Sequence, residues 1–346
     1  MTSQMDFSLS DALGRLASRS NLSREEASRA MTILLGGEAT PAQMGAFLMG
    51  LRMKGETEAE VAGLVESMRN SGVRIAPGRG PLVDLCGTGG DGLGTFNIST
   101  AASFVAAGSG CAVAKHGNRS ASSRCGSADV LEALQVPIDL APERACAMID
   151  DIGFAFLFAP LYHPAMKHVG PVRRELKIRT VFNLLGPLSN PAGAPYQLVG
   201  VYDDSVRPLM ARVLGLLGAR KAWVVHGAGN VDEISVAGPT HVTAAGTVAI
   251  QDRSAGEITL RPEECGIDPR PLDSLRGGDA AENARIIERV LGGEAGPHRD
   301  AVLLNAGAAV HVAGLASTLR EGIERARESI DSGKAHRILD LARRLR

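Results

Sequence analysis

Aromatic residues are scarce in this chain: Phe, Tyr and Trp together make up 3% of its 346 residues. A hydrophobic core must therefore be built mainly from Leu, Val, Ile and Ala. With 45% hydrophobic residues, the chain can fill one large domain or two unequal ones. An excess of one charge is also missing, because the formal net charge is −1. A protein whose main task is to hold nucleic acid is usually strongly basic, so we expect no nucleic-acid partner.

Cysteine motifs, long apolar runs and a leader are lacking as well. The five cysteines form no C-x-x-C pair and no Cys/His cluster with zinc spacing, which favours reduced thiols in a cytoplasmic protein. The first six residues contain neither the basic nor the apolar region of a signal peptide. No run of 18 uncharged apolar residues occurs, so we expect no association with a membrane.

Two patterns divide the chain. Residues 1–76 carry only helical signals, with helix starts at Ser23, Thr40 and Thr57. Beyond the Pro/Gly-rich residues 77–81, short strand-like runs alternate with helical segments. The strand-like runs are 82–86, 111–115, 154–158, 197–202 and 222–226, and the last helical segments lie near 281–291, 299–313 and 317–345.

We therefore predict a protein of the α/β class with two domains. A small all-helical domain covers residues 1–76 and is joined by a basic helical insert at about 164–185. A larger α/β domain with a mostly parallel central sheet covers residues 77–346.

The most informative segment is Asp84–Thr100. A strand-like run enters a loop with five glycines between positions 87 and 94, and a helix start rich in Ser, Thr and Asn follows. Glycines let the backbone approach a ligand closely, and the N-terminus of a helix attracts anions. The segment therefore predicts a phosphate site.

Gly87, Gly89 and Gly92 also match the G-x-G-x-x-G pattern of dinucleotide-binding proteins. Such a site needs an acidic residue about 20 positions later, to hold a ribose hydroxyl. No Asp or Glu occurs between positions 92 and 128, and the same stretch carries Lys115 and His116. This bias favours a more highly charged phosphate ligand over a dinucleotide.

A second polar loop, Lys115–Ser123, follows another strand-like run. Backbone N–H groups near Gly117 can form a nest for an anion, and the lysine adds positive charge. Alone, the loop is equally compatible with a polar turn that caps the next helix. Because ligands of parallel sheets bind at the carboxyl ends of strands, its position beside the first loop favours a shared anion site.

Two adjacent carboxylates, Asp232 and Glu233, follow the strand-like run at 222–226. Such a pair suits Mg²⁺, which prefers oxygen ligands and offsets the charge of a pyrophosphate. An acidic surface turn would look the same in the sequence.

The combination of Gly87–Asp91, Asn97–Thr100 and Lys115–Arg119 resembles the anthranilate phosphoribosyltransferase family of tryptophan biosynthesis. Further matches are 126–132, 163–166, 172–176 and 178–191, and the similarity runs from the helical N-terminus to the end of the chain. The resemblance implies a small helical domain packed on a larger α/β domain, an active site in the cleft between them, and a homodimer.

The family's reaction defines the ligands that the resemblance implies. The phosphoribosyl group of phosphoribosyl pyrophosphate (PRPP) is transferred to the amine of anthranilate, which gives N-(5-phosphoribosyl)anthranilate and pyrophosphate. Mg²⁺ is the implied cofactor, with two ions per monomer. No residue is assigned as a general base, because the amine is neutral at pH 7 and can lose its proton after it attacks C1.

The resemblance also assigns residues to these ligands. The implied PRPP contacts are Gly87, Gly90, Asp91, Thr95, Asn97, Ile98, Ser99, Thr100, Lys115, His116, Gly117, Asn118, Arg119, Ser120, Ala121, Ser122, Ser123 and Ser127. The implied anthranilate contacts are Gly87, Asn118 and Arg173, whose planar guanidinium can bind the carboxylate bidentately. The implied Mg²⁺ ligands are Ser99, Asp232 and Glu233.

The chain departs from the family pattern at two places. The loop at 227–232 is longer than in many relatives, which leaves its path open. Lys177 stands where many members have glycine, and we attach no function to it.

Two other functions stay open at this point. A pyrimidine nucleoside phosphorylase shares the two-domain fold, but it would need a nucleobase site in place of the region around Arg173. A non-catalytic relative that binds nucleic acid should show a basic face and a degraded metal pair, whereas Asp232 and Glu233 are both present here. The sequence therefore favours the transferase.

Overall fold

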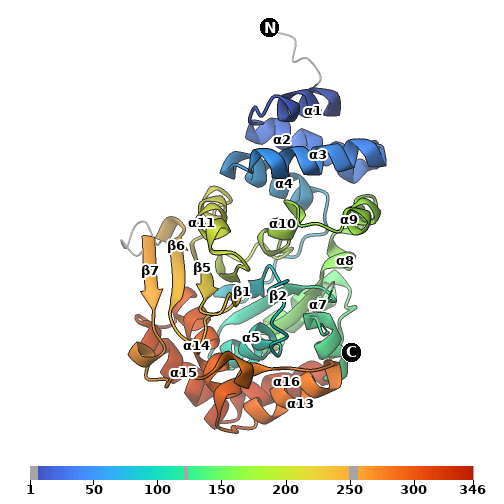
Figure 1. Cartoon of the computed structure of the whole chain (residues 1–346). Coiled ribbons are helices and arrows are strands. Elements are labelled where there is room, and N and C mark those ends of the chain that lie inside the picture. Colours follow the sequence, from blue (N-terminus) through green and yellow to red (C-terminus); the bar gives the residue numbers. More distant parts are fainter. Residues whose placement is uncertain (1–6, 121–123, 249–255, 346) are drawn as a thin grey trace. The chain divides into compact units, whose positions relative to one another are not determined.

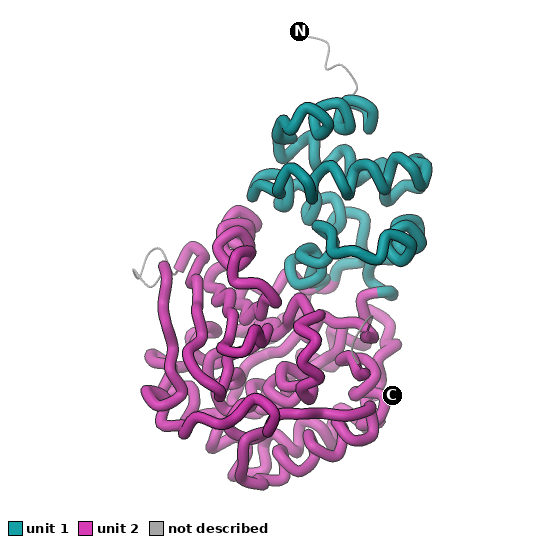
Figure 2. Tube along the Cα trace, viewed as in Figure 1, with its two compact units in different colours: residues 1–74, 160–191 teal, residues 75–159, 192–346 magenta. Residues whose placement is uncertain are grey.

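The computed structural model of the chain describes residues 7–120, 124–248 and 256–345. The chain forms two compact units, which Figure 2 shows in different colours. Unit 1 contains residues 1–74 and 160–191, and unit 2 contains residues 75–159 and 192–346. Each unit is thus assembled from two stretches of the sequence.

Unit 1 is built from helices, as predicted for the N-terminal part. Its helices are α1 (Leu9–Ala17), α2 (Arg24–Gly36), α3 (Pro41–Lys54), α4 (Glu58–Asn70), all but the first residue of α8 (Ala159–Tyr162), the 3-10 helix η1 (Pro164–Lys167), α9 (Gly170–Leu176) and α10 (Phe182–Leu188). Each of α1 to α4 begins at a capping box, in which a Ser or Thr hydroxyl and the side chain three residues later satisfy each other's backbone N–H. Because these contacts are local, the sequence alone predicts where three of the four helices begin.

Unit 2 is built on a seven-stranded sheet with the order β3-β2-β1-β4-β5-β6-β7. Figure 1 labels β1, β2, β5, β6 and β7. The strands are β1 (Leu82–Gly87), β2 (Ala112–Gly117), β3 (Phe154–Phe158), β4 (Tyr196–Gly200), β5 (Lys221–Gly227), β6 (Thr240–Ala245) and β7 (Gly256–Leu260). The first five pair in parallel, which confirms the predicted mostly parallel sheet. β6 and β7 are antiparallel and were not predicted. β7 buries none of its residues and therefore has no apolar run for the sequence to reveal.

The strand order reverses between β1 and β4. From β1 the chain continues to β2 and β3 on one side, and it then returns to β4 and β5 on the other. Gly87 and Gly200, the last residues of β1 and β4, are paired in this register. Ligands of open α/β sheets bind at such a reversal, outside the carboxyl ends of the strands.

The helices of unit 2 are α5 (Ile98–Gly108), α6 (Ser127–Ala133), α7 (Pro142–Ile152), α11 (Arg207–Leu216), α13 (Ala280–Leu291), α14 (Pro297–Val312), α15 (Leu319–Asp331) and α16 (Lys334–Arg344), with 3-10 turns η2 (Asp204–Val206), η3 (Glu263–Cys265) and η4 (Leu272–Leu275). α5 packs against α14, α15 and α16 (Figure 1). The helical segment expected near 317–345 is present as two helices, α15 and α16, divided at Gly333, whose φ of 75° lies in the left-handed region. None of the helices in the described ranges is long and apolar enough to cross a membrane.

Candidate active site

The glycine loop, Gly87–Asn97, leaves the end of β1 and leads into α5. Four of its glycines have φ between 66° and 78°, a backbone conformation that side chains with a Cβ rarely adopt: Gly89, Gly90, Gly92 and Gly94. Asn97 is the N-cap of α5, so the residues predicted at a helix start lie there. The loop therefore places a row of backbone N–H groups at the sheet reversal.

Residues 275–283 hold the glycine loop in place, and the sequence did not predict this contact. The N–H of Phe96 donates to Leu275 O at 3.0 Å, and Gly277 N donates to Gly94 O at 2.9 Å. The buried Asn283 of α13 donates to Asn97 Oδ1 at 2.9 Å. These contacts fix the loop before any ligand binds.

The acid pair, Asp232 and Glu233, reaches this loop by way of a tight turn. Gly227 and Val231 pair across three residues, and Gly229 and Asn230 between them both have positive φ. The loop at 227–232 therefore forms a compact hairpin. It turns the chain back over the end of the sheet.

Both carboxylates of the acid pair accept hydrogen bonds from the glycine loop and the start of α5. Asp232 Oδ2 accepts from Gly89 N at 2.7 Å, and Glu233 Oε1 accepts from Ser99 N at 3.0 Å. A Cβ on Gly87 or Gly200 would collide with Asp232. The acid pair and the predicted phosphate site are therefore one structure.

Electrostatics at the acid pair favour a bound cation. Burial raises the pKa of Asp232 to about 6, and the neighbouring Asp91 carboxylate contributes to this rise. Burial, followed by the charge of Asp232, raises the pKa of Glu233 to about 8. Carboxylates whose charged forms are disfavoured without a counter-ion are suitable ligands for a hard divalent ion, so the donor set fits Mg²⁺.

The side chain of Lys115 reaches from β2 to β1 and to the first turn of α5. Its Nζ donates to Leu85 O at 2.7 Å and to Ser99 Oγ at 3.2 Å, and only 2% of the residue is exposed. Burial lowers the pKa of Lys115, while the charges of Asp84 and Glu233 oppose this effect. Its ammonium group therefore supports Ser99 and the acid pair from inside the fold.

The second loop begins later than predicted: Lys115, His116 and Gly117 are the last residues of β2, and Asn118, Arg119 and Ser120 follow the strand. The main chain at Asn118 accepts a hydrogen bond from Ser127 Oγ at 3.2 Å. The Arg119 guanidinium pairs with Asp129 at 3.0 Å and also with Glu132. In the free chain this arginine thus binds to α6, a contact that the sequence did not suggest. The predicted contacts Ala121, Ser122 and Ser123 lie outside the described residues.

The remaining predicted PRPP contacts differ in burial and in hydrogen bonding. His116 and Thr100 are buried, and Gly117 abuts Ser127 and Phe156 so closely that a Cβ would collide with them. Ser120 N donates to Asp129 Oδ2 at 3.1 Å. The other predicted contacts, Gly90, Asp91, Thr95 and Ile98, belong to the glycine loop or to the first turn of α5.

Arg173 lies in α9 of unit 1. Its guanidinium stacks on the Phe182 ring with 4.9 Å to the ring centroid, and burial lowers its pKa. Among the described residues no Asp or Glu forms an ion pair with it. A half-buried guanidinium of this kind is suited to the carboxylate of a ligand.

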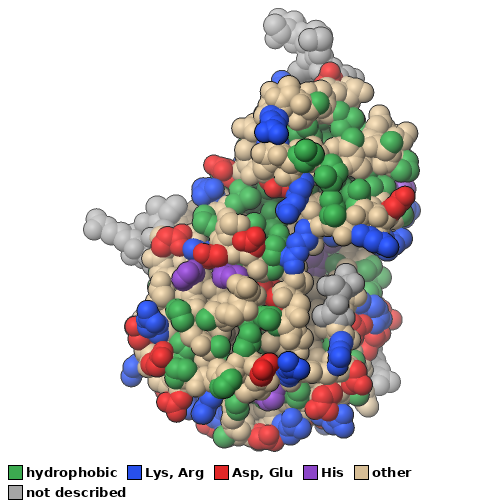
Figure 3. Space-filling model, viewed as in Figure 1, with side chains coloured by type: hydrophobic (Ala, Val, Ile, Leu, Met, Phe, Trp, Pro, Cys, Tyr) green, Lys and Arg blue, Asp and Glu red, His purple; other side chains and the backbone are tan. Residues whose placement is uncertain are grey.

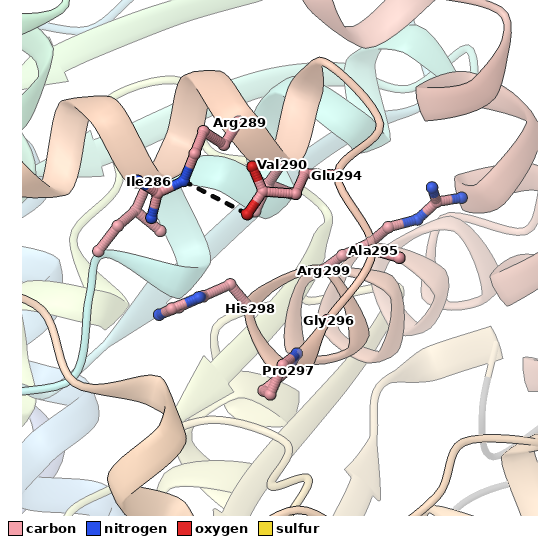
Figure 4. Close-up of a pocket in the computed structure, with 9 residues that line it drawn as sticks. All are labelled: Ile286, Arg289, Val290, Glu294, Ala295, Gly296, Pro297, His298 and Arg299. Atoms are coloured by element: carbon pink, nitrogen blue, oxygen red, sulfur yellow. Dashed lines mark ion pairs between the residues drawn. The ribbon is translucent and has the colours of Figure 1, made fainter.

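A small pocket lies elsewhere, between the end of α13 and the start of α14 (Figure 4). Its two arginines are already paired, Arg289 with Glu294 at 3.5 Å and Arg299 with Asp331 at 2.6 Å. His298 meets the Phe96 ring edge-on at 4.8 Å. His298 therefore packs against Phe96 of the glycine loop. The two arginines of the pocket are engaged by the protein's own carboxylates.

Sequence reasoning missed three contributors to the site. Asp84 is a fully buried carboxylate inside β1, and its Oδ1 accepts from His116 N at 3.2 Å. Gly200 provides space for Asp232, and Asn283 anchors Asn97. An aspartate within an apolar strand-like run was the one signal available, because buried charges need partners.

Two family models identify the class of protein to which the chain belongs. The model described as "Glycosyl transferase family, a/b domain" matches residues 79–336, and "Glycosyl transferase family, helical bundle domain" matches residues 10–72. The chain is 54% identical to an anthranilate phosphoribosyltransferase of Symbiobacterium thermophilum and 50% identical to one of Myxococcus xanthus. These alignments cover 96% and 95% of this chain and 96% of each relative.

Solved structures agree with this result. An anthranilate phosphoribosyltransferase from Thermus thermophilus has a TM-score of 0.91 and 45% identity, with 97% of this chain and 99% of that chain covered. The enzyme from Saccharomyces cerevisiae in complex with PRPP and Mg has a TM-score of 0.88 and 28% identity, with 97% of each chain covered.

Fold and site together define a two-domain glycosyl transferase, here a pentosyltransferase. More narrowly, the chain belongs to the anthranilate phosphoribosyltransferase family, and its activity is that of this enzyme of tryptophan biosynthesis. The transferase prediction is thereby confirmed against the nucleoside phosphorylase and the non-catalytic alternatives.

Proposed function

We propose that the glycine loop, the second loop and the acid pair bind PRPP together with Mg²⁺. One observation carries this proposal: Gly89 N and Ser99 N donate to Asp232 and Glu233. The N–H donors suited to pyrophosphate and the carboxylates suited to a cation thus converge on the same place. The proposed PRPP contacts are the residues assigned by resemblance above, and the proposed metal ligands are Ser99, Asp232 and Glu233.

The chain's own groups would stabilise pyrophosphate as it leaves C1 of the ribose. Backbone N–H groups of the glycine loop and of the first turn of α5 can donate to its oxygens, and they are fixed in advance by contacts such as Phe96 N to Leu275 O. Mg²⁺, when bound, neutralises the charge that develops on the pyrophosphate. We propose two ions per monomer, as the resemblance to the family implies.

For anthranilate we propose contacts with Gly87, Asn118 and Arg173. The Arg173 guanidinium would hold the carboxylate and so orient the amine toward C1. The neutral amine forms the new C1–N bond while the C1–O bond to pyrophosphate breaks, and it afterwards releases its proton to water. A general base is therefore not required.

The histidines fit this mechanism without a catalytic role. His163 is buried in unit 1 with Nε2 3.0 Å from Ser189 O, and burial lowers its pKa. A neutral, hydrogen-bonded imidazole in that position is a structural group.

We propose that the protein is a homodimer. α3 carries apolar residues on its exposed side as well as its buried side, and Met53 is 70% exposed there. Figure 3 shows hydrophobic side chains gathered at the surface of unit 1. A second copy of the chain can bury the apolar exposed side of this helix in a symmetric dimer. We also propose a cytoplasmic location, because all five cysteines are free thiols.

Fluorescence tests the catalytic proposal directly, because anthranilate fluoresces. With purified protein, PRPP and Mg²⁺, its signal should fall at a rate proportional to enzyme concentration. A chelator should stop the fall, and added Mg²⁺ should restore it. Turnover that proceeds equally well with no divalent ion would contradict the proposal.

A further inference from the structure

Asn305 is a fully buried polar residue in α14 for which the mechanism above has no use. Its Oδ1 accepts from Ile234 N at 2.9 Å, and its Nδ2 donates to Ile234 O at 3.0 Å and to Ala301 O at 2.9 Å. Both amide hydrogens and the oxygen are thus engaged. A flipped amide would place its NH₂ group against the N–H of Ile234, so the side chain has one orientation.

Ile234 is the residue directly after the acid pair. It lies in the irregular segment between β5 and β6, where no neighbouring strand provides hydrogen bonds in the register of the sheet. Buried backbone groups must nevertheless be paired. Asn305 satisfies both the N–H and the C=O of Ile234, as an adjacent strand would.

The acid pair is therefore held from two directions. On one side Glu233 accepts from Ser99 N, and on the other the following peptide is fixed by Asn305. A carboxylate holds a metal ion well only when its backbone is placed within a fraction of an ångström, and groups behind the ligands provide that precision.

We propose that Asn305 is a positioning residue for Asp232 and Glu233. It fixes the main chain from which the two carboxylates reach the metal ion. This inference rests on the proposed assignment of the acid pair as Mg²⁺ ligands. A purely structural asparagine would lower stability when removed, but would leave the Mg²⁺ requirement as it is.

The variant Asn305→Ala removes the three hydrogen bonds of this side chain, and Ser329→Ala is its matched control. Ser329 is also buried in the C-terminal helical layer, and its Oγ donates to Val105 O at 2.9 Å, but it does not contact the acid pair. PRPP binding is measured by calorimetry at increasing Mg²⁺ concentrations, well below each melting temperature.

For Asn305→Ala we expect the Mg²⁺ concentration for half-maximal PRPP binding to rise about tenfold or more, as is usual when support behind a metal ligand is lost. At saturating Mg²⁺ the PRPP affinity should return close to that of the unmodified protein. Ser329→Ala should not change the Mg²⁺ requirement. An unchanged requirement in folded Asn305→Ala would overturn the proposal.

Asp232→Asn separates the two levels of the inference. If this variant does not change the Mg²⁺ requirement, the metal assignment itself is wrong. If it does and Asn305→Ala does not, the assignment stands and only the role of Asn305 fails.

Amide hydrogen exchange of the unmodified protein provides a test that needs no variant. With both polar groups bonded to Asn305, the Ile234 amide should exchange as slowly as the amides of β5. Exchange as fast as that of exposed loops would overturn the proposal even if Asn305→Ala failed to fold.

Discussion

The carboxylate of Asp232 accepts a hydrogen bond from the backbone N–H of Gly89 at 2.7 Å, across 143 residues of sequence. This contact unites two motifs that the sequence presents separately, a glycine-rich loop and an acidic pair. It also shows that donors proposed for phosphate are partly engaged by the protein itself before the substrate binds. On the proposed assignment, PRPP and Mg²⁺ would exchange these contacts for their own.

Gly87→Ala should damage the site more than the fold. A Cβ at Gly87 would collide with the Asp232 carboxylate, whose side chain would have to shift. A displacement of about 1 Å in a catalytic group can cost about 100-fold in rate, so we expect a loss of that order in kcat/KM for PRPP. Gly215→Ala is the control, because a Cβ there contacts nothing. Full activity in Gly87→Ala would show that Asp232 does not need its present position.

The stabilisation that PRPP and Mg²⁺ confer should increase with pH. Glu233 has a folded pKa of about 8, well above the ordinary value of about 4.3. A raised carboxyl pKa means that the folded state binds the proton more tightly, so this group reduces stability as the pH rises through that interval. Metal binding needs the deprotonated form and reverses the loss.

Melting temperatures with and without PRPP and Mg²⁺, at about pH 6 and about pH 8.5, test this pH dependence. The ligand-induced shift should be larger at the higher pH, and Glu233→Gln should reduce the difference between the two. An equal shift at both pH values would argue against direct binding of metal by Glu233.

Arg173→Ala should raise the KM for anthranilate far more than the KM for PRPP. A hydrogen bond to a charged group contributes about 1.5–3 kcal/mol, which corresponds to a rise of about 10-fold to 100-fold. Its neighbour Arg174 is exposed, and Arg174→Ala provides the control. Equal changes in both KM values would show that Arg173 does not hold anthranilate.

Lys177→Gly should stabilise the protein. Lys177 ends α9 with φ of 52°, in the left-handed region where a Cβ is unfavourable. Glycine adopts this conformation without that cost. After the greater freedom of glycine in the unfolded chain is subtracted, we expect a gain of about 0.5–1 kcal/mol in the free energy of unfolding. Denaturant unfolding measures it, and a loss of stability would contradict this explanation.

Much of the fold follows from local signals. The five parallel strands are short apolar runs, and the starts of α2, α3 and α4 are marked by Ser or Thr at the N-cap. By contrast, β7 is an edge strand with no buried residue, so its side chains need not be apolar. The break at Gly333 was overlooked because the helical pattern continues on both sides of it.

The site is less predictable because its supports lie far apart in the sequence. Asn283 anchors Asn97 across 186 residues, and Asn305 binds Ile234 across 71. An isolated asparagine in a helix carries no signal of its partner. Arg119 shows the same limit, since its pairing with α6 becomes visible only when the second loop is folded.

We propose that the acid pair and the glycine loop form one site for PRPP with Mg²⁺. Calorimetric titration of PRPP in the presence of Mg²⁺ tests it most directly, with Asp232→Asn and Glu233→Gln compared with the unmodified chain. Asp151→Asn, an exposed carboxylate of the same unit, serves as control. We predict that each acid-pair variant binds PRPP about 10-fold to 100-fold more weakly at the same Mg²⁺ concentration, while the control is unchanged. Unaltered affinity in both acid-pair variants would contradict the account.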